Sequence, residues 1–496
     1  MNLGILTWLI LLPVAASFAL LFFKRDRTTE IKVFAFIVTL LIFLLSLELF
    51  VNFSAAKSGM QFEQIHAWIP QFGINYHVGV DGISLFLVLL TTLLGPICVL
   101  CSWKQIEKRI KEFFIALLLL EAGVIGVFVS LDLIMFYIFW EAMLIPMYLL
   151  IGIWGGESRI YAAVKFFIYT MVGSLLMFVA ILYLYSRTGT FDVQGMQWKL
   201  HLPFAVQCWL FLAFGLSFAI KVPLFPFHTW LPWAHTEAPT AGSVILAGVL
   251  LKMGVYGFLR FAIPFFPQAA QYFTPAIAVL AIIGIIYGAL MSLAQDDLKK
   301  LIAYSSVSHL GYVMLGIFAF NVRGMEGGIY QMLNHGVSTG ALFLLVGFIY
   351  ERRHTREISE YGGIAKVIPV YAVIFMIVTL SSIGLPGTNG FIGEFLILLG
   401  AFEARNIYGI LAASGVVLGA AYMLWLYQRI FFGKITNPKN EHLEDVNKRE
   451  MAYLLPLLIL IFVMGLMPNI FLSRTAKSVN DFLKNQAAYF QGINKP

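Results

Sequence analysis

The chain has 496 residues, of which 60% are hydrophobic and only 12% are charged, whereas a soluble globular chain has about 25% charged residues. This composition, with a mean hydropathy of +0.86, excludes an ordinary soluble domain and predicts an all-α polytopic membrane protein. The formal net charge of +7 is explained by basic loops between apolar segments and gives no reason to expect nucleic-acid binding.

Apolar segments of about 20 residues, the length that crosses a bilayer, recur along the whole sequence. They predict fourteen helices, at residues 3–23, 31–53, 79–101, 112–130, 132–153, 163–186, 206–230, 241–263, 274–293, 300–320, 328–349, 369–398, 408–430 and 450–472. The first segment is read as a retained helix, because its basic residues follow the apolar run instead of preceding it as in a signal peptide. The amphipathic tail 473–490 is expected to lie along the membrane surface.

Basic residues are unevenly divided between the predicted loops. One alternating set of loops contains twenty Lys or Arg residues, whereas the other set contains five, with four more in the tail. The positive-inside rule places the first set in the cytoplasm. Both termini are therefore expected on the non-cytoplasmic side.

Two of the predicted helices are interrupted. The interruptions are the run KVPLFPFHTWLP in helix 206–230 and the run SSIGLPGTNGF in helix 369–398. Proline has no N–H, so Pro223 is expected to leave the carbonyl of Ala219 without its helical partner, and Pro386 acts similarly in the second run. Broken backbone at membrane depth is tolerated only inside protein or beside a wet cavity.

The two broken helices occupy corresponding places if helices 4–8 are compared with helices 9–13. Each is the fourth of a five-helix set, and an odd number of helices gives the two sets inverted topology. Paired broken helices in inverted repeats indicate an ion or substrate path. The predicted organisation is therefore N-terminal helices in 1–111, a first five-helix repeat in 112–263, an inverted second repeat in 264–430, and the last helix and tail in 431–496.

Four ionisable residues lie within apolar segments, where a charge costs roughly 3 kcal/mol or more. They are Glu141, Lys221, Lys252 and Glu394. The most natural use for such residues is to move protons. Glu141 and Lys221 are expected to face each other between the fifth and seventh helices, so that a small change in their separation loads or releases a proton. The alternative is a static ion pair.

Lys252 has no acidic neighbour within its own helix, and small residues beside it allow close packing and room for water. Lys252 is therefore predicted to be a proton relay. The alternative is that it is an anchor whose side chain reaches the membrane interface. Glu394 follows the second break and either ends the path towards the outer side or only stabilises the broken helix. Two weaker candidates are Glu121, an extra uptake carboxylate in mid-span, and Asp132, which is also placed to cap a helix.

Several chemistries have no support in the sequence. There is no G-x-G-x-x-G motif after a strand, no P-loop and no cysteine cluster. Cys98 and Cys101 form a C-x-x-C pair, but two thiols alone cannot hold an iron–sulfur cluster. No cofactor and no metal are therefore expected in this chain, and the thiols are interpreted as packing residues.

The longest motif, LFPFHTWLPWAHTEAPTAGSVILAGVLLKMGVYGFLRF, resembles the signature of the antiporter-like subunits of respiratory complex I and of Mrp-type cation/proton antiporters. Further matching runs are FYIFWEAMLIPMYLLIGIWG, DLKKLIAYSSVSHLGYVMLG, MLNHGVSTGALFLLVG and IGLPGTNGFIGEF. Most related chains have lysine at the position of Glu394, and a glutamate there resembles the subunit M family of NADH–quinone oxidoreductase, the counterpart of mitochondrial chain 4. The sequence departs from the family at Trp233, where aspartate is usual.

The resemblance implies a proton-translocating module of the bacterial inner membrane that is catalytic only as part of a complex. It makes His309 and His335 candidate relays between Lys252 and Glu394; taken alone, each would be read as a hydrogen-bonded core histidine. FMN, iron–sulfur clusters and quinone are expected in other subunits. The implied partners are other membrane-arm subunits, including neighbouring antiporter-like subunits, and the lipid bilayer. An Mrp-type sodium/proton antiporter subunit and a membrane scaffold with inert charges are the alternatives.

Overall fold

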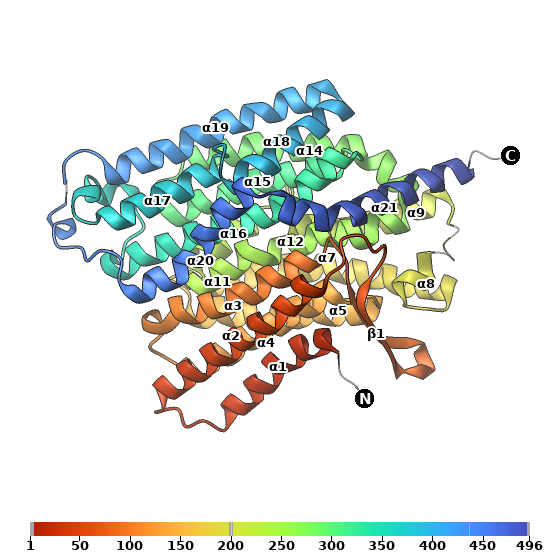
Figure 1. Cartoon of the computed structure of the whole chain (residues 1–496), viewed down its shortest axis with the longest axis horizontal. Helices are drawn as coiled ribbons and strands as arrows, with labels where there is room; N and C mark the ends of the chain where they lie inside the picture. The colour runs from red at the N-terminus through yellow and green to blue at the C-terminus, as the bar shows by residue number, and fades with distance from the viewer. Residues whose placement is uncertain (1–3, 198–199, 201, 436, 494–496) are drawn as a thin grey trace.

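The computed structural model describes residues 4–197, 200, 202–435 and 437–493. Its helices form a bundle in which the N-terminal helices lie along one flank and α19 lies along the opposite flank (Figure 1). Among the described residues, eleven helices are long and apolar enough to cross a membrane. The predicted all-α membrane class is confirmed, whereas the number of fourteen crossings and the inverted repeat stay predictions.

Helices are present in each of the predicted spans of the first half of the chain. They are α1 (Ile5–Leu21), α2 (Thr28–Asn52), α3 (Leu85–Gln105), α4 (Ile110–Val129), α5 (Leu133–Ala142), α6 (Leu144–Trp154), α7 (Arg159–Thr188), α8 (Val193–Gln197), α9 (Phe204–Lys221), α10 (Trp230–Glu237), α11 (Thr240–Ile245), α12 (Leu251–Gly257) and α13 (Ile263–Phe265). Two π-helical turns, η2 (Leu246–Leu250) and η3 (Phe258–Ala262), join α11, α12 and α13 into one helical passage.

The second half is also helical in each predicted span. Its helices are α14 (Pro267–Leu293), α15 (Leu298–Ile317), α16 (Val322–Arg353), α17 (Pro369–Ser382), α18 (Asn389–Ala404), α19 (Asn406–Phe431), α20 (Lys448–Leu466) and α21 (Asn469–Ile493). Short 3₁₀ turns are η1 (Pro70–Phe72), η4 (Ile358–Glu360), η5 (Ile364–Lys366) and η6 (Pro438–Asn440). The α11–α13 passage and α16 are the most buried candidate membrane helices among the described residues, so they form the centre of the bundle.

Both predicted helix breaks are present. The chain leaves helical geometry at 222–229, between α9 and α10, and at 383–388, between α17 and α18. As expected, Pro223 offers no N–H to the carbonyl of Ala219, and this carbonyl accepts the N–H of Leu224, one residue further along, at 2.8 Å. The N–H of Leu385 closes the end of α17 with the same five-residue spacing, at 3.0 Å. The two interrupted helices therefore end in the same way.

A β-hairpin is a regular element that the sequence analysis did not predict. It pairs β1 (Gln61–Ile69) with β2 (Ile74–Val80) in antiparallel register. The helix predicted at 79–101 consequently begins later, at Leu85, because residues 79 and 80 belong to β2 and residues 81–84 form the turn that follows it. The hairpin lies at the right-hand end of the bundle in Figure 1, near α8 and below the middle of α21.

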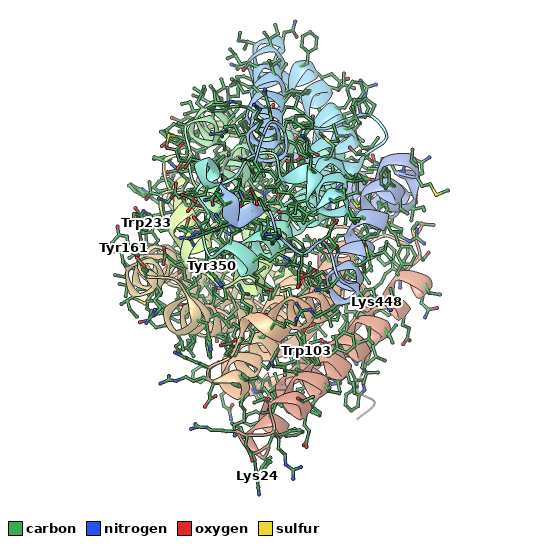
Figure 2. The ribbon with its side chains drawn as sticks, turned by 90° about the vertical axis from the view of Figure 1, so that its left-hand side faces the viewer. Lys24, Trp103, Tyr161, Trp233, Tyr350 and Lys448 are labelled. Atoms are coloured by element: carbon green, nitrogen blue, oxygen red, sulfur yellow. The ribbon has the colours of Figure 1, made fainter. Side chains whose placement is uncertain are left out.

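The opposite end of the bundle is the one that the basic loops occupy. Figure 2 looks onto this end and labels residues from the ends of several helices and from the loop between α1 and α2. The labelled residues are Lys24, Trp103, Tyr161, Trp233, Tyr350 and Lys448. The hairpin and the basic loops thus lie at opposite ends of the helices, as the alternation of loop charge requires.

Candidate functional site

A lysine and a histidine meet in the buried centre of the bundle. Lys252 lies on α12 and is 0% exposed, and its Nζ is 2.5 Å from Nδ1 of His335 on α16. The same ammonium donates a hydrogen bond to the carbonyl of Ala247 in the π-helical turn η2. A charged lysine has only donors, so Nδ1 of His335 accepts in this arrangement. The contact is therefore one across which a proton can pass from lysine to imidazole.

A second pair continues the series on the other side of His335. The rings of His335 and His309 have centroids 5.9 Å apart, and Nε2 of His335 has no protein partner among the described residues. Nδ1 of His309, on α15, is 2.9 Å from Oε1 of Glu394 on α18. The same oxygen accepts a hydrogen bond from Gln331 at 3.0 Å. The predicted residues Lys252, His335, His309 and Glu394 thus form one buried series.

The second helix break adjoins the end of this series. Ser382, the last residue of α17, places its hydroxyl 3.4 Å from Nε2 of His309. Gly384 has φ +73°, and a Cβ added there would lie only 3.1 Å from Oε2 of Glu394. The non-helical turn therefore packs directly against the carboxylate. The broken helix thus brings the backbone of Gly384 close to a buried acid, where a residue with a side chain would crowd the carboxylate.

The predicted pair of Glu141 and Lys221 is close but not in direct contact. Nζ of Lys221, at the end of α9, lies 3.7 Å from the sulfur of Met143 and over the rings of Trp140 and Phe166, at 5.4 and 5.3 Å. Oε1 of Glu141 has no hydrogen-bond partner among the described residues. The two groups are within electrostatic range of each other. A cation held mainly by aromatic faces is not locked to its carboxylate, so the static ion pair is absent.

His235 is a buried ionisable residue that the sequence analysis did not select. It lies on α10, after the first break, and its ring stacks on Phe343 of α16 with centroids 4.5 Å apart. Neither ring nitrogen has a partner among the described residues. The ring is within electrostatic range of both Lys252 and Lys299. The run HTWLPWAHTEAPT around it gave no signal beyond the family motif, and only the stacking of His235 on Phe343 of α16 reveals it.

A cavity of about 340 Å³ opens at the end of the bundle where the basic loops lie. Its lining includes Glu237, Thr240, Lys299 and Tyr350, the last of which Figure 2 labels on that end. Lys299 is buried there and donates to the carbonyl of Ala238 at 2.5 Å. Glu237 is the last residue of α10, the helix that contains His235, and Lys299 lies in the first turn of α15, so the cavity extends to the end of the helix that contains His235.

The two weaker candidates have different surroundings. Asp132 caps α5, because its carboxylate accepts the N–H groups of Ile134 and Met135. Glu121 is buried on α4, and neither of its oxygens has a partner among the described residues. It lies against Gly95 of α3 beside a cavity of about 10 Å³, close to the space that one water requires. No hydrogen bond joins either residue to the Lys252–Glu394 series within the described part of the chain.

Trp233, where the sequence departs from the family pattern, lies at the surface of the basic end (Figure 2). The ammonium groups of Lys165 and Lys300 lie 5.9 and 6.0 Å from its ring. The indole face thus attracts the two cations without a carboxylate. Cys98, Cys101 and Cys208 are free thiols, and no cluster of metal-binding side chains occurs among residues 4–197, 200, 202–435 and 437–493.

Comparison with known proteins gives consistent matches over the whole chain. Residues 130–472 match a family model described as NADH:quinone oxidoreductase/Mrp antiporter, TM. NADH-quinone oxidoreductase subunit M of Rhodobacter capsulatus is 49% identical over 503 residues, which cover 98% of this chain and 97% of that protein.

Two solved structures have a similar fold. A chain of respiratory complex I from Thermus thermophilus with bound NADH superposes with a TM-score of 0.88 at 34% identity, covering 96% of this chain and 99% of that one. A chain of the Mrp complex from a Dietzia species superposes with a TM-score of 0.84 at 22% identity, covering 98% and 99%. At this lower identity the second match shows the fold alone.

Proposed function

The chain belongs to the NADH-quinone oxidoreductase subunit M family, and we propose that it translocates protons as one module of the membrane arm of complex I. The observation that supports this most directly is the buried series Lys252–His335–His309–Glu394, whose members come from four different helices. Each member can gain and lose a proton, and burial of four such groups is too costly to be accidental.

The geometry suggests how a proton moves along the series. Lys252 donates to Nδ1 of His335, and the Nε2–H of the resulting imidazolium then faces His309. The ring centroids of these two histidines are 5.9 Å apart, so His309 is the next group in the series. His309 in turn donates to Oε1 of Glu394, beside the second helix break. Lys252 is then neutral and ready to take a proton from the side of His235 and the cavity at the basic end.

In the proposal, Glu141 and Lys221 regulate proton movement along this path. When the carboxylate of Glu141 moves away from Lys221, the buried ammonium loses a nearby negative charge and its charged form becomes less favourable. Because Lys221 is held by aromatic faces and a thioether rather than by the carboxylate, the distance between the two charges is free to change. A structural ion pair would have fixed that distance.

Replacement of Lys221 with alanine tests the proposed function. We expect the complex to assemble and coupled quinone reduction to fall at least about tenfold, which corresponds to roughly 1.4 kcal/mol. The measurement is NADH-driven quinone reduction and vesicle acidification, normalised to assembled complex. Lys165→Ala, a part-exposed lysine on α7, is the control and should keep wild-type rates. Wild-type acidification by the Lys221 variant would mean that this lysine has no part in translocation.

The redox reaction itself is proposed to occur outside this chain. FMN, iron–sulfur clusters and quinone are assigned to other subunits of the NADH-quinone oxidoreductase complex, and this chain contacts neighbouring membrane-arm subunits and lipid. The Mrp-type antiporter alternative is supported by fold alone, at 22% identity, and Glu394 in place of lysine disfavours it. The proposed location is the bacterial inner membrane.

The orientation is testable by labelling introduced cysteines. We expect Lys57→Cys, beside the hairpin, to react with a membrane-impermeant maleimide in right-side-out membranes, and Lys439→Cys, between α19 and α20, to react only in inverted vesicles. Both side chains are exposed, and the positive-inside rule puts only the second in the cytoplasm. The native thiols are buried or lie on apolar helices. The reverse labelling pattern would refute the predicted orientation.

A further inference from the structure

An almost fully buried histidine at the hairpin end lies between two carboxylates. His77 is on β2 and is 2% exposed. Its Nδ1 is 2.5 Å from Oδ1 of Asp192, in the segment between α7 and α8, and its Nε2 is 2.7 Å from Oε1 of Glu63 on β1. Ionised carboxylates only accept hydrogen bonds, so both ring nitrogens must donate. The geometry therefore requires the imidazolium form.

The charges around His77 favour this form. Burial alone would lower the pKa of His77, but the hydrogen bonds to Asp192 and Glu63 raise it above the usual value. Asp132 also approaches Asp192, with which it forms an isolated bridge through the backbone. Gln194 donates to Glu63 at 3.1 Å and brings no charge. His77 is thus the cation that faces Asp192 and Glu63, while the carboxylate of Asp132 accepts backbone N–H groups.

Residues 130–133, which lie beside His77, lead directly into α5. The N–H of Leu131 donates to the carbonyl of His77 at 2.8 Å, and the carbonyl of Leu131 accepts the N–H of Val193 at 2.9 Å. Asp132 accepts the N–H of Asn75 at 3.1 Å and caps α5 through its other oxygen. Residues 130–133 consequently lie between β2 and 191–193. The side chain of His77 joins the two outer segments across them.

We propose that His77 is a positioning residue that clamps the hairpin and segment 190–195 around the linker 130–133, and thereby fixes the start of the helix that holds Glu141 near Lys221. This inference rests on the proposed function for its effect on proton translocation. A neutral ring retains a single N–H, so loss of the proton leaves one carboxylate without its donor and facing a ring lone pair in a buried site. The clamp then opens.

The direction of the pH dependence follows from the raised pKa of His77. The stabilisation from the clamp is fully present below the ordinary histidine pKa and is lost as the pH rises through the raised value. The relevant pH is that of the compartment that the hairpin faces. Tight positioning of α5 is therefore expected under acid conditions on that side, and looser positioning under alkaline conditions.

The test compares His77→Gln with His66→Gln in the assembled complex. His66 is an exposed histidine on the same hairpin, so its replacement controls for loss of a titratable group there. The measurement is protons translocated per NADH oxidised, as a function of pH on the hairpin side. In the wild type and in His66→Gln, the number of protons translocated per NADH should fall at alkaline pH. In His77→Gln this number should be at least roughly twofold lower near neutral pH and should not change with pH. A wild-type profile in His77→Gln would overturn the proposal.

A second variant and a structural readout separate this inference from the proposed function. The double variant Glu63→Gln/Asp192→Asn keeps both acceptor oxygens but no longer needs a charged ring, so its coupling should not depend on the titration of His77. Hydrogen exchange of amides 131–136, compared at one pH, should be faster in His77→Gln than in the wild type. If the amides of His77→Gln exchange at the wild-type rate, His77 does not clamp the linker. If they exchange faster but the number of protons translocated per NADH is unchanged, the clamp does not position α5 for proton translocation. Failure of the proposed function would instead appear with Lys221→Ala.

Discussion

Replacing Lys252 with arginine should stop proton translocation almost as completely as replacing it with alanine. The guanidinium keeps its charge at every accessible pH because it is not deprotonated in proteins. The structure places Nζ of Lys252 2.5 Å from Nδ1 of His335 in a fully buried site. In the proposed path Lys252 passes its proton to this nitrogen, which arginine cannot do. We expect a loss of at least about tenfold in coupled activity, or about 1.4 kcal/mol.

The measurement is proton translocation and NADH-driven quinone reduction in vesicles, normalised to assembled complex. Lys252→Met, which keeps the length of the side chain without a titratable group, separates loss of the proton from the greater bulk of arginine and should fail equally with normal assembly. Lys57→Arg, at an exposed position, is the control and should pump normally. An arginine or methionine variant that pumps at the wild-type ratio would show that Lys252 does not pass protons.

Glu394→Gln is expected to have an effect of similar size. The amide oxygen of glutamine can still accept from His309 and Gln331, which lie 2.9 and 3.0 Å from Oε1 in the native protein. Shape and hydrogen bonds are therefore kept, but the side chain can neither take nor release a proton. Coupled activity should fall at least about tenfold, and the helix break should remain intact.

The matched control for this variant lies on the same helix. Glu403 is an exposed residue of α18 that pairs with Arg323, and exposed ion pairs contribute little. Glu403→Gln should therefore leave both assembly and acidification of vesicles unchanged. If Glu394→Gln acidified vesicles as fast as Glu403→Gln, the series of proton sites would have to end at His309.

The sequence could predict the features of this protein that depend on local composition. Apolar runs of membrane-spanning length identify the helices, and the prolines at 223 and 386 place both interruptions, because a missing N–H acts within one helical turn. The cost of burying charge selects Glu141, Lys221, Lys252 and Glu394 without any knowledge of packing. The family motif added His309 and His335, and the comparisons confirm the family.

Only the tertiary structure decided which of these residues meet. Lys252 and His335 are 83 residues apart in sequence, and His309 and Glu394 are 85 apart, so their contacts depend on how the helices pack and not on any local pattern. Packing likewise holds Lys221 against aromatic rings, and it brings His235 against α16. The clamp at His77 joins three segments whose pairing is non-local. Composition determines the energetic cost of a buried charge, whereas the partners that offset this cost come from distant helices.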